Sequence, residues 1–263
     1  MGGARVAVIT GASSGIGEAT ARQLAARGWH CVLLARRGDR LEQVASEIGG
    51  EWELCDVADR EQVNEVAARV LAKHPAVGLL LNNAGMPARG SFLEIEPELI
   101  ERVIDVNYLG GVWCVRAFLP GLQSAARAGS GAVGAHVVNL VSVAGTVAFA
   151  PAGAYAASKH AQLAFSRSTA ALLRGSGIGV LTVMPGFVET EGFPQHSVLS
   201  SRILRRFVIE PEEVATKIVD AVERGKREIT VPWFPYRLIS IAQVVLPSVL
   251  ARFAGASGYR KGV

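Results

Sequence analysis

The chain is poor in cysteine, in aromatic residues and in charge. Its 263 residues include 3 cysteines, 6% aromatic residues and 19% charged residues, with a net charge of +4. The cysteines, Cys31, Cys55 and Cys114, are odd in number and lie in apolar segments without metal-ligand spacing. We therefore expect reduced thiols in the core of a cytoplasmic protein, and no metal site.

The positive charge is not organised for nucleic acid. Lys and Arg are scattered, without the interleaved aromatic residues or the basic helix face of a nucleic-acid-binding protein. An apolar strand begins a few residues after Met1, so we expect no signal or transit peptide. Half of the residues are hydrophobic, enough for the core of one large α/β domain.

The first feature that the chain does contain is a glycine-rich turn. Residues 6–9 predict a buried parallel strand and residues 18–27 predict a helix, with glycines at 11, 15 and 17 between them. Such a turn brings backbone N–H groups and the positive end of a helix dipole to a dinucleotide pyrophosphate. A tight connection without a ligand is the alternative. The cofactor candidates from this turn are Gly11, Ser13, Ser14, Gly15, Ile16 and Gly17.

Two arginines follow the second predicted strand, residues 31–35. In a dinucleotide fold a carboxylate at this position binds the ribose 2′-hydroxyl, whereas an arginine accommodates a 2′-phosphate. Arg36 stands where the acid would be, Arg37 follows it, and the next acid is Asp39. Because a guanidinium pairs with phosphate through charge-assisted hydrogen bonds, we favour NADP(H) over NAD(H). A solvated pair of surface arginines is the other interpretation.

The ends of the third and fourth predicted strands add further candidates. The third, residues 52–55, is followed by Asp56, which would accept from an adenine amino group or cap the next helix. The fourth, residues 77–81, is followed by asparagines and small residues that admit a cofactor or tie neighbouring strands together. The cofactor candidates from these two strand ends are Asp56, Val57, Asn83, Ala84 and Gly85.

The rest of the chain continues the alternation of helix and strand. Predicted helices cover residues 40–48, 60–73, 98–119, 155–173 and 210–224, and predicted strands cover 136–142, 179–184 and 228–231. Residues 120–134, which begin with Pro120, are expected to be a connection rich in Gly and Ala. Asn107 lies inside a predicted helix, where Asn is unfavourable. We expect either a local kink with a bound water at Asn107 or simple packing.

Three residues in the second half of the chain form a candidate catalytic set. Tyr155 and Lys159 are four apart in a predicted helix and share one face, and Ser142 ends a predicted strand thirteen residues before Tyr155. A phenol ionises near pH 10, and a neighbouring ammonium lowers that pKa. We therefore expect Lys159 to lower the pKa of Tyr155, the proton donor or acceptor. Ser142 would hydrogen-bond the substrate oxygen.

Taken in order, these motifs resemble the short-chain dehydrogenase/reductase family. The resemblance covers residues 4–232 and implies a Rossmann-type, doubly wound α/β fold with seven parallel strands in the order 3-2-1-4-5-6-7. It also implies a homodimer or homotetramer packed through the helices at 98–119 and 154–173. The residues that carry it are Thr10-Gly11-x-x-x-Gly15-x-Gly17, Asn82-Asn83-Ala84-Gly85, Asn107, Ser142, Tyr155-x-x-x-Lys159 and Pro185-Gly186.

The resemblance also implies roles for single residues. Lys159 would bind the nicotinamide ribose, and Asn107 would hold a water that links Lys159 to solvent as a proton relay. Val188 and Thr190 would contact the nicotinamide carboxamide. Tyr155 and Lys159 thus belong to both the catalytic and the cofactor set, and Pro185 and Gly186 complete the latter.

The C-terminal part of the chain is less informative. Residues 187–210 are expected to form a substrate loop, whose arginines at 202, 205 and 206 would bind an acidic substrate or be solvated. Residues 236–263 form an apolar extension, in which the 14 residues 238–251 carry no charge. That segment is too short to span a bilayer. We expect it to pack on the domain, on a partner subunit or, through residues 238–253, on a membrane surface.

These observations predict a catalytic domain, residues 1–235, that interconverts a ketone or aldehyde and an alcohol with NADP(H). The apolar extension and the uncharged loop at 143–153 favour a lipophilic small-molecule substrate. A 3-oxoacyl-thioester reductase and a non-catalytic NADP-binding regulatory protein are the alternatives. We expect a cytoplasmic location, with membrane association if the extension binds lipid.

Overall fold

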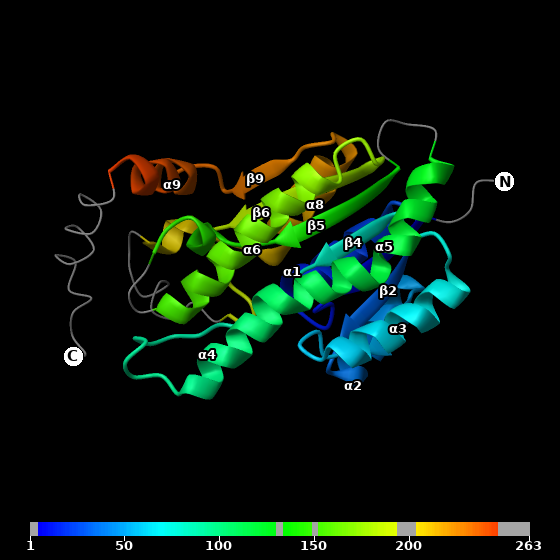
Figure 1. The fold of residues 1–263 in the computed structure, drawn as a ribbon, viewed down its shortest axis with the longest axis horizontal. Helices are drawn as coiled ribbons and strands as arrows, with labels where there is room; N and C mark the ends of the chain where they lie inside the picture. Colours follow the sequence, from blue (N-terminus) through cyan, green and yellow to red (C-terminus); the bar gives the residue numbers. More distant parts are fainter. Residues whose placement is uncertain (1–4, 130–133, 149–151, 194–203, 247–263) are drawn as a thin grey trace.

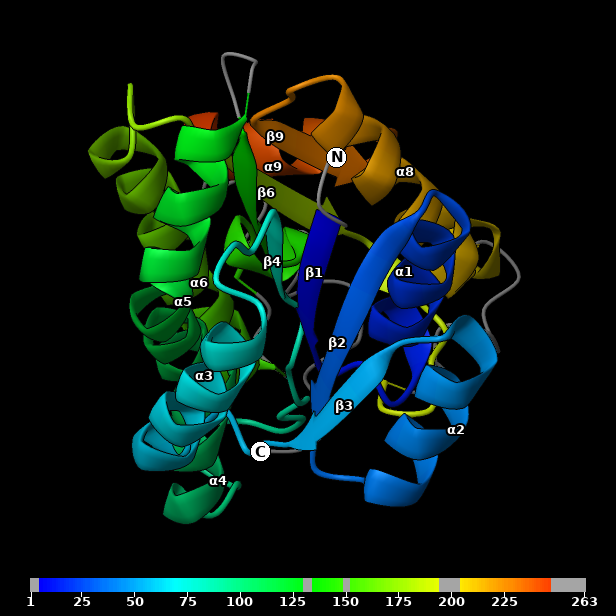
Figure 2. The ribbon, with the colours of Figure 1, turned by 90° about the vertical axis from the view of Figure 1, so that its right-hand side faces the viewer.

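Seven parallel strands form one sheet in a computed structural model that describes residues 5–129, 134–148, 152–193 and 204–246. Their order is β3-β2-β1-β4-β5-β6-β9 (Figure 1 and Figure 2), so the predicted order is confirmed, with β9 as the seventh strand. The short strands β7 (Phe187–Val188) and β8 (Val208–Ile209) pair with each other separately. The sheet strands are β1 (Arg5–Thr10), β2 (Trp29–Ala35), β3 (Glu51–Leu54), β4 (Leu79–Asn82), β5 (Ala135–Leu140), β6 (Ile178–Pro185) and β9 (Glu228–Val231).

Helices cover both faces of this sheet (Figure 2). One face carries α1 (Gly15–Ala26), α2 (Gly38–Ile48) and α8 (Pro211–Glu223). The other carries α3 (Arg60–Lys73), α5 (Gly110–Ala128) and α6 (Gly153–Leu172), with α4 (Pro97–Ile104) leading into α5. The predicted doubly wound, Rossmann-type fold is therefore confirmed.

Each face of the sheet has its own apolar core. All residues of β1 after Arg5 are buried, as expected for a parallel strand covered on both sides. Their side chains alternate: Ile9 packs toward α1 and α2, whereas Val8 packs toward α3 and α5. The three cysteines are buried and unpaired in these cores, as predicted. Burial raises the pKa of Cys31 and Cys55 to about 12.

One helix is longer than the sequence predicts. α5 continues through Pro120 to Ala128, so the expected connection at 120–134 was placed too early. A proline inside a helix costs roughly 3 kcal/mol through a lost hydrogen bond and a steric clash. Phe118 and Leu122, on either side of Pro120, are fully buried. Each such side chain contributes about 1.5–3 kcal/mol when buried, so tertiary packing outweighs the cost of the proline.

A π-helical turn, η1 (Asp105–Leu109), joins α4 to α5. Asn107 lies at its centre with 1% of its surface exposed. The helix is thus locally irregular at Asn107, as a π turn, a form that often occurs at functional sites. The bound water at this position stays a prediction.

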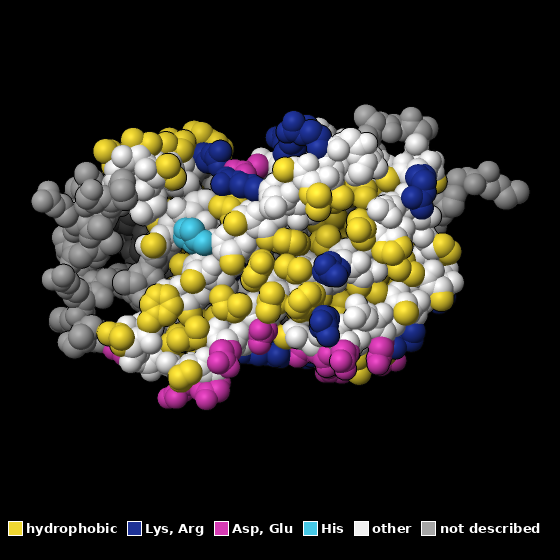
Figure 3. Space-filling model, viewed as in Figure 1, with side chains coloured by type: hydrophobic (Ala, Val, Ile, Leu, Met, Phe, Trp, Pro, Cys, Tyr) yellow, Lys and Arg dark blue, Asp and Glu magenta, His cyan; other side chains and the backbone are white. Residues whose placement is uncertain are grey.

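The C-terminal extension begins with helix α9 (Tyr236–Val245), which turns its polar side inward. The hydroxyl of buried Ser240 lies 2.7 Å from the hydroxyl of Thr146 and donates to the Tyr236 carbonyl. Large apolar side chains point outward, with 47% to 79% of their surface exposed (Figure 3, upper left). They are Leu238, Ile241, Val244, Val245 and Leu246.

Part of the extension, residues 247–263, lies outside the described residues. Within the described part of the chain, α9 included, no helix is both long and apolar enough to cross a bilayer. Contact of the outward side of α9 with a partner subunit or a membrane surface stays a prediction.

Candidate active site

The candidate residues lie along one edge of the sheet because parallel strands all end there. The glycine turn follows β1, Arg36 follows β2, and Asn83 follows β4. Ser142 lies two residues beyond β5, and Gly186 directly follows β6. This carboxyl edge is where ligands bind in open α/β sheets.

The glycine turn forms a cradle that larger residues would fill. Gly11 and Gly15 have φ of +63° and +58°, the left-handed region that favours glycine. A Cβ on Gly11 would lie 2.8 Å from the Cα of Ala84, and one on Gly15 would lie 3.0 Å from the Cγ2 of Thr190. Ser14 precedes α1 without capping its first N–H groups through the side chain. The start of α1 is thus available to an anion.

Of the two arginines, Arg37 contacts this turn. Its guanidinium donates to the hydroxyl of Ser14 at 2.8 Å and to that of Ser13 at 3.2 Å. It also pairs with the carboxylate of Glu191 at 2.7 Å, which joins it to the loop after β7. Arg36 is exposed, and no hydrogen bond or ion pair links its side chain to another described residue.

Asp56 has a partner that the sequence did not indicate. Its carboxylate pairs with Arg102 of α4 and accepts from the N–H of Ala58 at 3.1 Å. The helix cap that was one interpretation of Asp56 belongs instead to Asp59, which accepts from the N–H groups of residues 61 and 62. The neighbouring Val57 is buried against Gly110 at the start of α5.

The end of β4 is tied firmly to the end of β1. The amide of Asn83 donates to the carbonyls of Thr10 and Gly11 at 2.9 and 3.0 Å. The hydroxyl of Thr10 accepts from the N–H groups of Asn83 and Ala84, both at 3.0 Å. Asn83 therefore has the structural role that the sequence left open. Gly85 follows, and a Cβ there would lie 3.8 Å from the ammonium nitrogen of Lys159.

Tyr155, Ser142 and Lys159 come together at the start of α6. Ser142 precedes a 3-10 turn, and its hydroxyl oxygen accepts from the N–H of Ala144 at 3.1 Å. This leaves the hydroxyl proton for Tyr155, to which Ser142 is hydrogen-bonded. The Lys159 ammonium lies 5.8 Å from the centroid of the Tyr155 ring. It donates to the Leu140 carbonyl at 3.0 Å and to the Gln162 amide oxygen at 2.8 Å.

The pKa of Tyr155 differs from the value that the sequence led us to expect. Burial raises the pKa of Tyr155 to about 12, although the hydrogen bond from Ser142 acts in the opposite direction. Burial also lowers the pKa of Lys159 to about 7. The predicted lowering of the Tyr155 pKa by Lys159 is therefore wrong for this structure. Desolvation outweighs the ammonium, which points its hydrogen bonds to Leu140 and Gln162 rather than to the phenol.

Asn107 is held by the chain itself. Its side-chain oxygen accepts from the Met86 N–H at 2.8 Å, and its amide donates to the Met86 carbonyl and to the Ser158 hydroxyl, both at 3.0 Å. These contacts join η1 to the loop after β4 and to α6, next to Lys159. The proton relay through Asn107 stays a prediction.

Buried polar side chains below the edge hold the strands in register. The amide of Asn82 on β4 donates to Asn139 on β5 at 2.8 Å, and Asn139 donates to Ser166 of α6 at 2.9 Å. The Ser166 hydroxyl lies 2.7 Å from that of Thr182 on β6. The chain of hydrogen bonds thus links three strands to the helix that carries Tyr155. Apart from Asn82, none of these residues was singled out from the sequence.

The end of β6 meets both the loop beyond it and α9. Pro185 and Val188 are buried, and Thr190 bridges to Phe193, whose ring centroid lies 5.8 Å from that of Tyr155. A Cβ on Gly186 would overlap the ring of Tyr236. The sequence did not indicate Phe193 or Tyr236, because each approaches the site from a segment without a motif. Most of the expected substrate loop, residues 194–203 with Arg202, lies outside the described residues, as does the side chain of Arg205.

The sequence profile of the family described as short chain dehydrogenase matches residues 5–197. The chain belongs to the short-chain dehydrogenase/reductase family. Among its relatives, the protein named Dehydrogenase/reductase SDR family member 7B from Xenopus laevis is 30% identical over 287 residues. The match spans 98% of this chain and 84% of the relative. The protein is thus an oxidoreductase of this family.

Solved structures of the family agree with the fold. A short chain dehydrogenase/reductase from Burkholderia phymatum in complex with NAD is 28% identical, with a TM-score of 0.79. The alignment covers 94% of this chain and 95% of that one. An actinorhodin polyketide ketoreductase variant with NADPH is 26% identical, with a TM-score of 0.77, and covers 87% and 95%. The similar structures thus include complexes with either cofactor.

Proposed function

We propose that this oxidoreductase uses NADP(H) to interconvert a ketone or aldehyde and an alcohol, with Tyr155 as general acid and base. The observation that carries the proposal is the contact between the hydroxyls of Ser142 and Tyr155, beside the buried ammonium of Lys159. These groups lie on the same sheet edge as a glycine cradle and a free helix start. The arrangement supplies a proton next to a dinucleotide site.

The residues present fit a dinucleotide. A Cβ at Gly11 or Gly15 would press against Ala84 or Thr190, so glycine is what brings the backbone of this turn close to the neighbouring strand ends, and the first N–H groups of α1 have no side-chain cap. When bound, the nicotinamide supplies or accepts the hydride at the substrate carbon. Lys159 has three N–H donors, of which two are used by Leu140 and Gln162, so one is available for a ribose hydroxyl.

The raised pKa of Tyr155 favours the reductive direction. A phenol with a pKa of about 12 keeps its proton at neutral pH, which is the form that protonates a developing alkoxide. Ser142 donates its hydrogen bond to the Tyr155 oxygen and stabilises the negative charge that remains there once the phenol has given up its proton. Lys159, with a pKa of about 7, exists in both protonation states near neutral pH. It therefore suits the return of a proton to Tyr155, with Asn107 in the relay.

Preference for NADP(H) rests on the two arginines and the serines beside them. Arg37 donates to Ser13 and Ser14 at the cradle, and Arg36 adds a second exposed guanidinium at the same strand end. A 2′-phosphate placed there would accept charge-assisted hydrogen bonds. Asp56 keeps a candidate role toward adenine, although its carboxylate is shared with Arg102.

Apolar groups around Tyr155 favour a lipophilic substrate. Phe193 contacts the Tyr155 ring from the loop after β7. Phe92 packs against Gly153 at the start of α6, with 53% of its surface exposed. Similarity to a polyketide ketoreductase favours a second candidate, reduction of a 3-oxoacyl thioester. Activity on acetoacetyl thioesters against lipophilic ketones distinguishes the two.

The test is NADPH oxidation with a panel of carbonyl compounds, for the natural chain and Tyr155→Phe. We expect Tyr155→Phe to lower kcat by about 10²- to 10⁴-fold while NADPH binding, followed by fluorescence, is retained. The control is Tyr108→Phe, which removes a phenol hydroxyl on η1. A near-normal rate for Tyr155→Phe would refute the assignment. NADPH binding without turnover of any compound would favour the regulatory alternative.

We further propose that α5 and α6 form a subunit interface. Hydrophobic side chains gather over these two helices on one face of the molecule (Figure 3). Contiguous apolar surface of this kind marks interaction sites in many proteins. Sedimentation equilibrium should give a mass of two or four chains, and a single-chain mass would contradict the proposal.

A further inference from the structure

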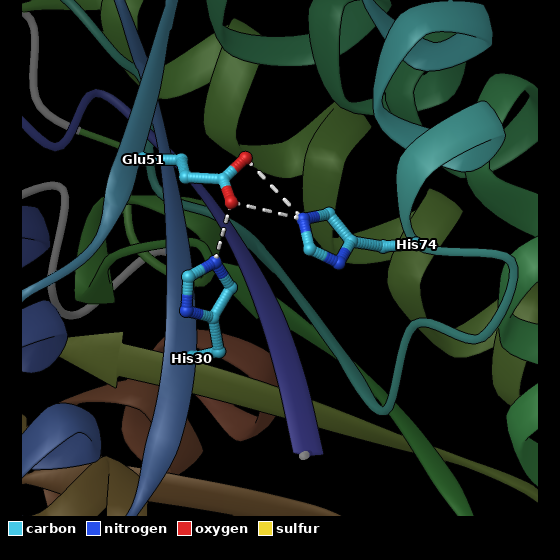
Figure 4. Close-up of side chains that lie close together, drawn as sticks. All are labelled: His30, Glu51 and His74. Carbon is cyan, nitrogen blue, oxygen red and sulfur yellow. Dashed lines mark hydrogen bonds and ion pairs between the residues drawn. The ribbon is translucent and has the colours of Figure 1, made fainter. Parts of the chain in front are cut away.

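Three side chains with metal-binding chemistry lie close together at the amino edge of the sheet (Figure 4). His30 is the second residue of β2, and Glu51 is the first residue of β3. His74 is the C-terminal cap of α3. Within the described part of the chain, this is the one group of three or more His, Cys, Asp or Glu residues with its ligand atoms this close.

The two imidazoles point the same nitrogen at one carboxylate. The Nε2 of His30 lies 3.0 Å from Oε1 of Glu51, and the Nε2 of His74 lies 3.3 Å from both carboxylate oxygens. All three donor atoms fall within 4.8 Å of one another. Zn²⁺ bound tetrahedrally at about 2.0–2.2 Å separates its ligand atoms by about 3.3 Å. The side chains therefore need little movement to enclose such an ion.

The surroundings leave space for a bound ion. A hollow of about 370 Å³ adjoins the three residues and leaves room for a water as a fourth ligand.

Lys73 is the competitor for this carboxylate. Its ammonium lies 2.9 Å from Oε2 of Glu51, in a salt bridge. However, 65% of the Lys73 side chain is exposed, compared with 17% for His74 and 26% for His30. An exposed lysine at the end of a helix can turn into solvent at little cost, because surface ion pairs contribute only about 0–1 kcal/mol.

We propose that His30, Glu51 and His74 bind a divalent transition-metal ion of the Zn²⁺ type. The ligand set of two imidazoles and one carboxylate is one that zinc uses in proteins. The ion would tie the starts of β2 and β3 to the end of α3, on the side of the sheet away from Tyr155. The expectation of no metal site came from cysteine spacing and did not consider residues so far apart in the chain.

The test is an isothermal calorimetric titration of the full-length, chelator-treated protein with Zn²⁺. We expect one ion per chain at this site and a rise in Tm with zinc. His30→Gln and His74→Gln should each weaken binding by on the order of 10- to 100-fold. The matched control is His160→Gln, an exposed histidine on α6, which should bind zinc as the natural chain does. Co²⁺ in place of Zn²⁺ should give the visible spectrum of an ion with imidazole ligands.

Lys73→Met separates a metal site from a plain ion-pair cluster, and it changes a residue whose side chain is 65% exposed. If the residues bind metal, removing the competing ammonium raises the affinity for Zn²⁺. If they form only an ion-pair cluster, Lys73→Met has no zinc response to alter. No heat of binding to the natural chain, or equal binding by the natural chain and both histidine variants, would overturn the proposal.

Discussion

The two edges of the sheet differ in how their side chains are brought together. At the carboxyl edge, glycines and hydroxyl residues lie within short stretches that follow β1 and β5, and Tyr155 and Lys159 share one helical turn. At the amino edge, His30, Glu51 and His74 come from three elements with no local spacing in common. The group of side chains at the carboxyl edge can therefore be predicted from sequence motifs. The amino edge depends on the strand register, which pairs residue 32 of β2 with residue 51 of β3, and on where α3 ends at His74.

The largest effect should come from filling the cradle at the carboxyl edge. In Gly17→Ala the new Cβ would overlap the carbonyl oxygen of Gly11 and the amide of Asn83. We expect the free energy of unfolding to fall by about 1–3 kcal/mol, with loss of NADPH binding. Urea unfolding and cofactor fluorescence measure the two effects.

The matched control for Gly17→Ala is Gly38→Ala, at the start of α2. A Cβ there would lie 3.4 Å from a methyl group of Leu54, an ordinary contact. Replacing this helical glycine should leave stability unchanged or raise it by about 0.4–1 kcal/mol. Equal losses in both variants would show that the tight packing of the cradle is not what distinguishes this edge.

A smaller effect should separate the two arginines. Arg37 contacts the cradle, so Arg37→Ala should lower kcat/KM for NADPH by about tenfold or more, because a charged hydrogen bond contributes about 1.5–3 kcal/mol. Arg36→Ala should cost less, and Arg36→Asp should shift preference toward NADH. The measurement is the ratio of kcat/KM for NADPH and NADH in each variant. An unchanged ratio in Arg36→Asp would remove Arg36 from cofactor selection.

The smallest effect should appear in thiol labelling, which samples each edge separately. Cys31 lies near the start of β2 and Cys55 directly after β3, and burial raises the pKa of both to about 12. Both thiols thus stay protonated at pH 8, and labelling requires local opening. We expect NADP(H) to slow alkylation of Cys55 more than that of Cys31, and Zn²⁺ to do the reverse. Equal protection by either ligand would contradict the separation of the two edges.

The pKa of these thiols also sets the sign of a pH effect. The folded pKa lies above the ordinary value of 9.0, so the unfolded chain loses its thiol protons first. The stabilisation is complete below pH 9 and is lost as the pH rises toward 12. Thermal unfolding between pH 8 and pH 10 should show a falling Tm.

The alternation of strands and helices could be predicted because it depends on local patterns, whereas the strand order followed from the family resemblance. The bounds of α3 and β9 match the predictions, since Asp59, His74 and the residues around β9 mark clear ends. Helix α5 was predicted too short because Pro120 outweighs its neighbours in any local pattern. Burial of Phe118 and Leu122 becomes visible only when the helix lies on the sheet.

The features that the sequence did not predict depend on contacts between segments that are distant in the chain. Whether Arg36 or Arg37 contacts the glycine turn depends on the direction in which each side chain points after the end of β2. The pKa of Tyr155 depends on how deeply α6 is buried, which residue spacing does not reveal. Tyr236 fits against Gly186 from 50 positions further along the chain. No local sequence pattern encodes such contacts.

The π turn at residues 105–109 positions Asn107, and it also sets the direction in which the side chains of α5 point relative to those of α4. Each helical residue advances the side-chain direction by about 100°, so one additional residue in a turn offsets everything that follows. Val103, before the turn, packs beside Ala154 and Tyr155, whereas Phe118, after it, packs in the core beneath the sheet. Deleting a single residue here would rotate one of these surfaces out of place. The π turn thus allows the continuous helical segment from α4 to α5 to pack both beside Tyr155 and in the core against the sheet.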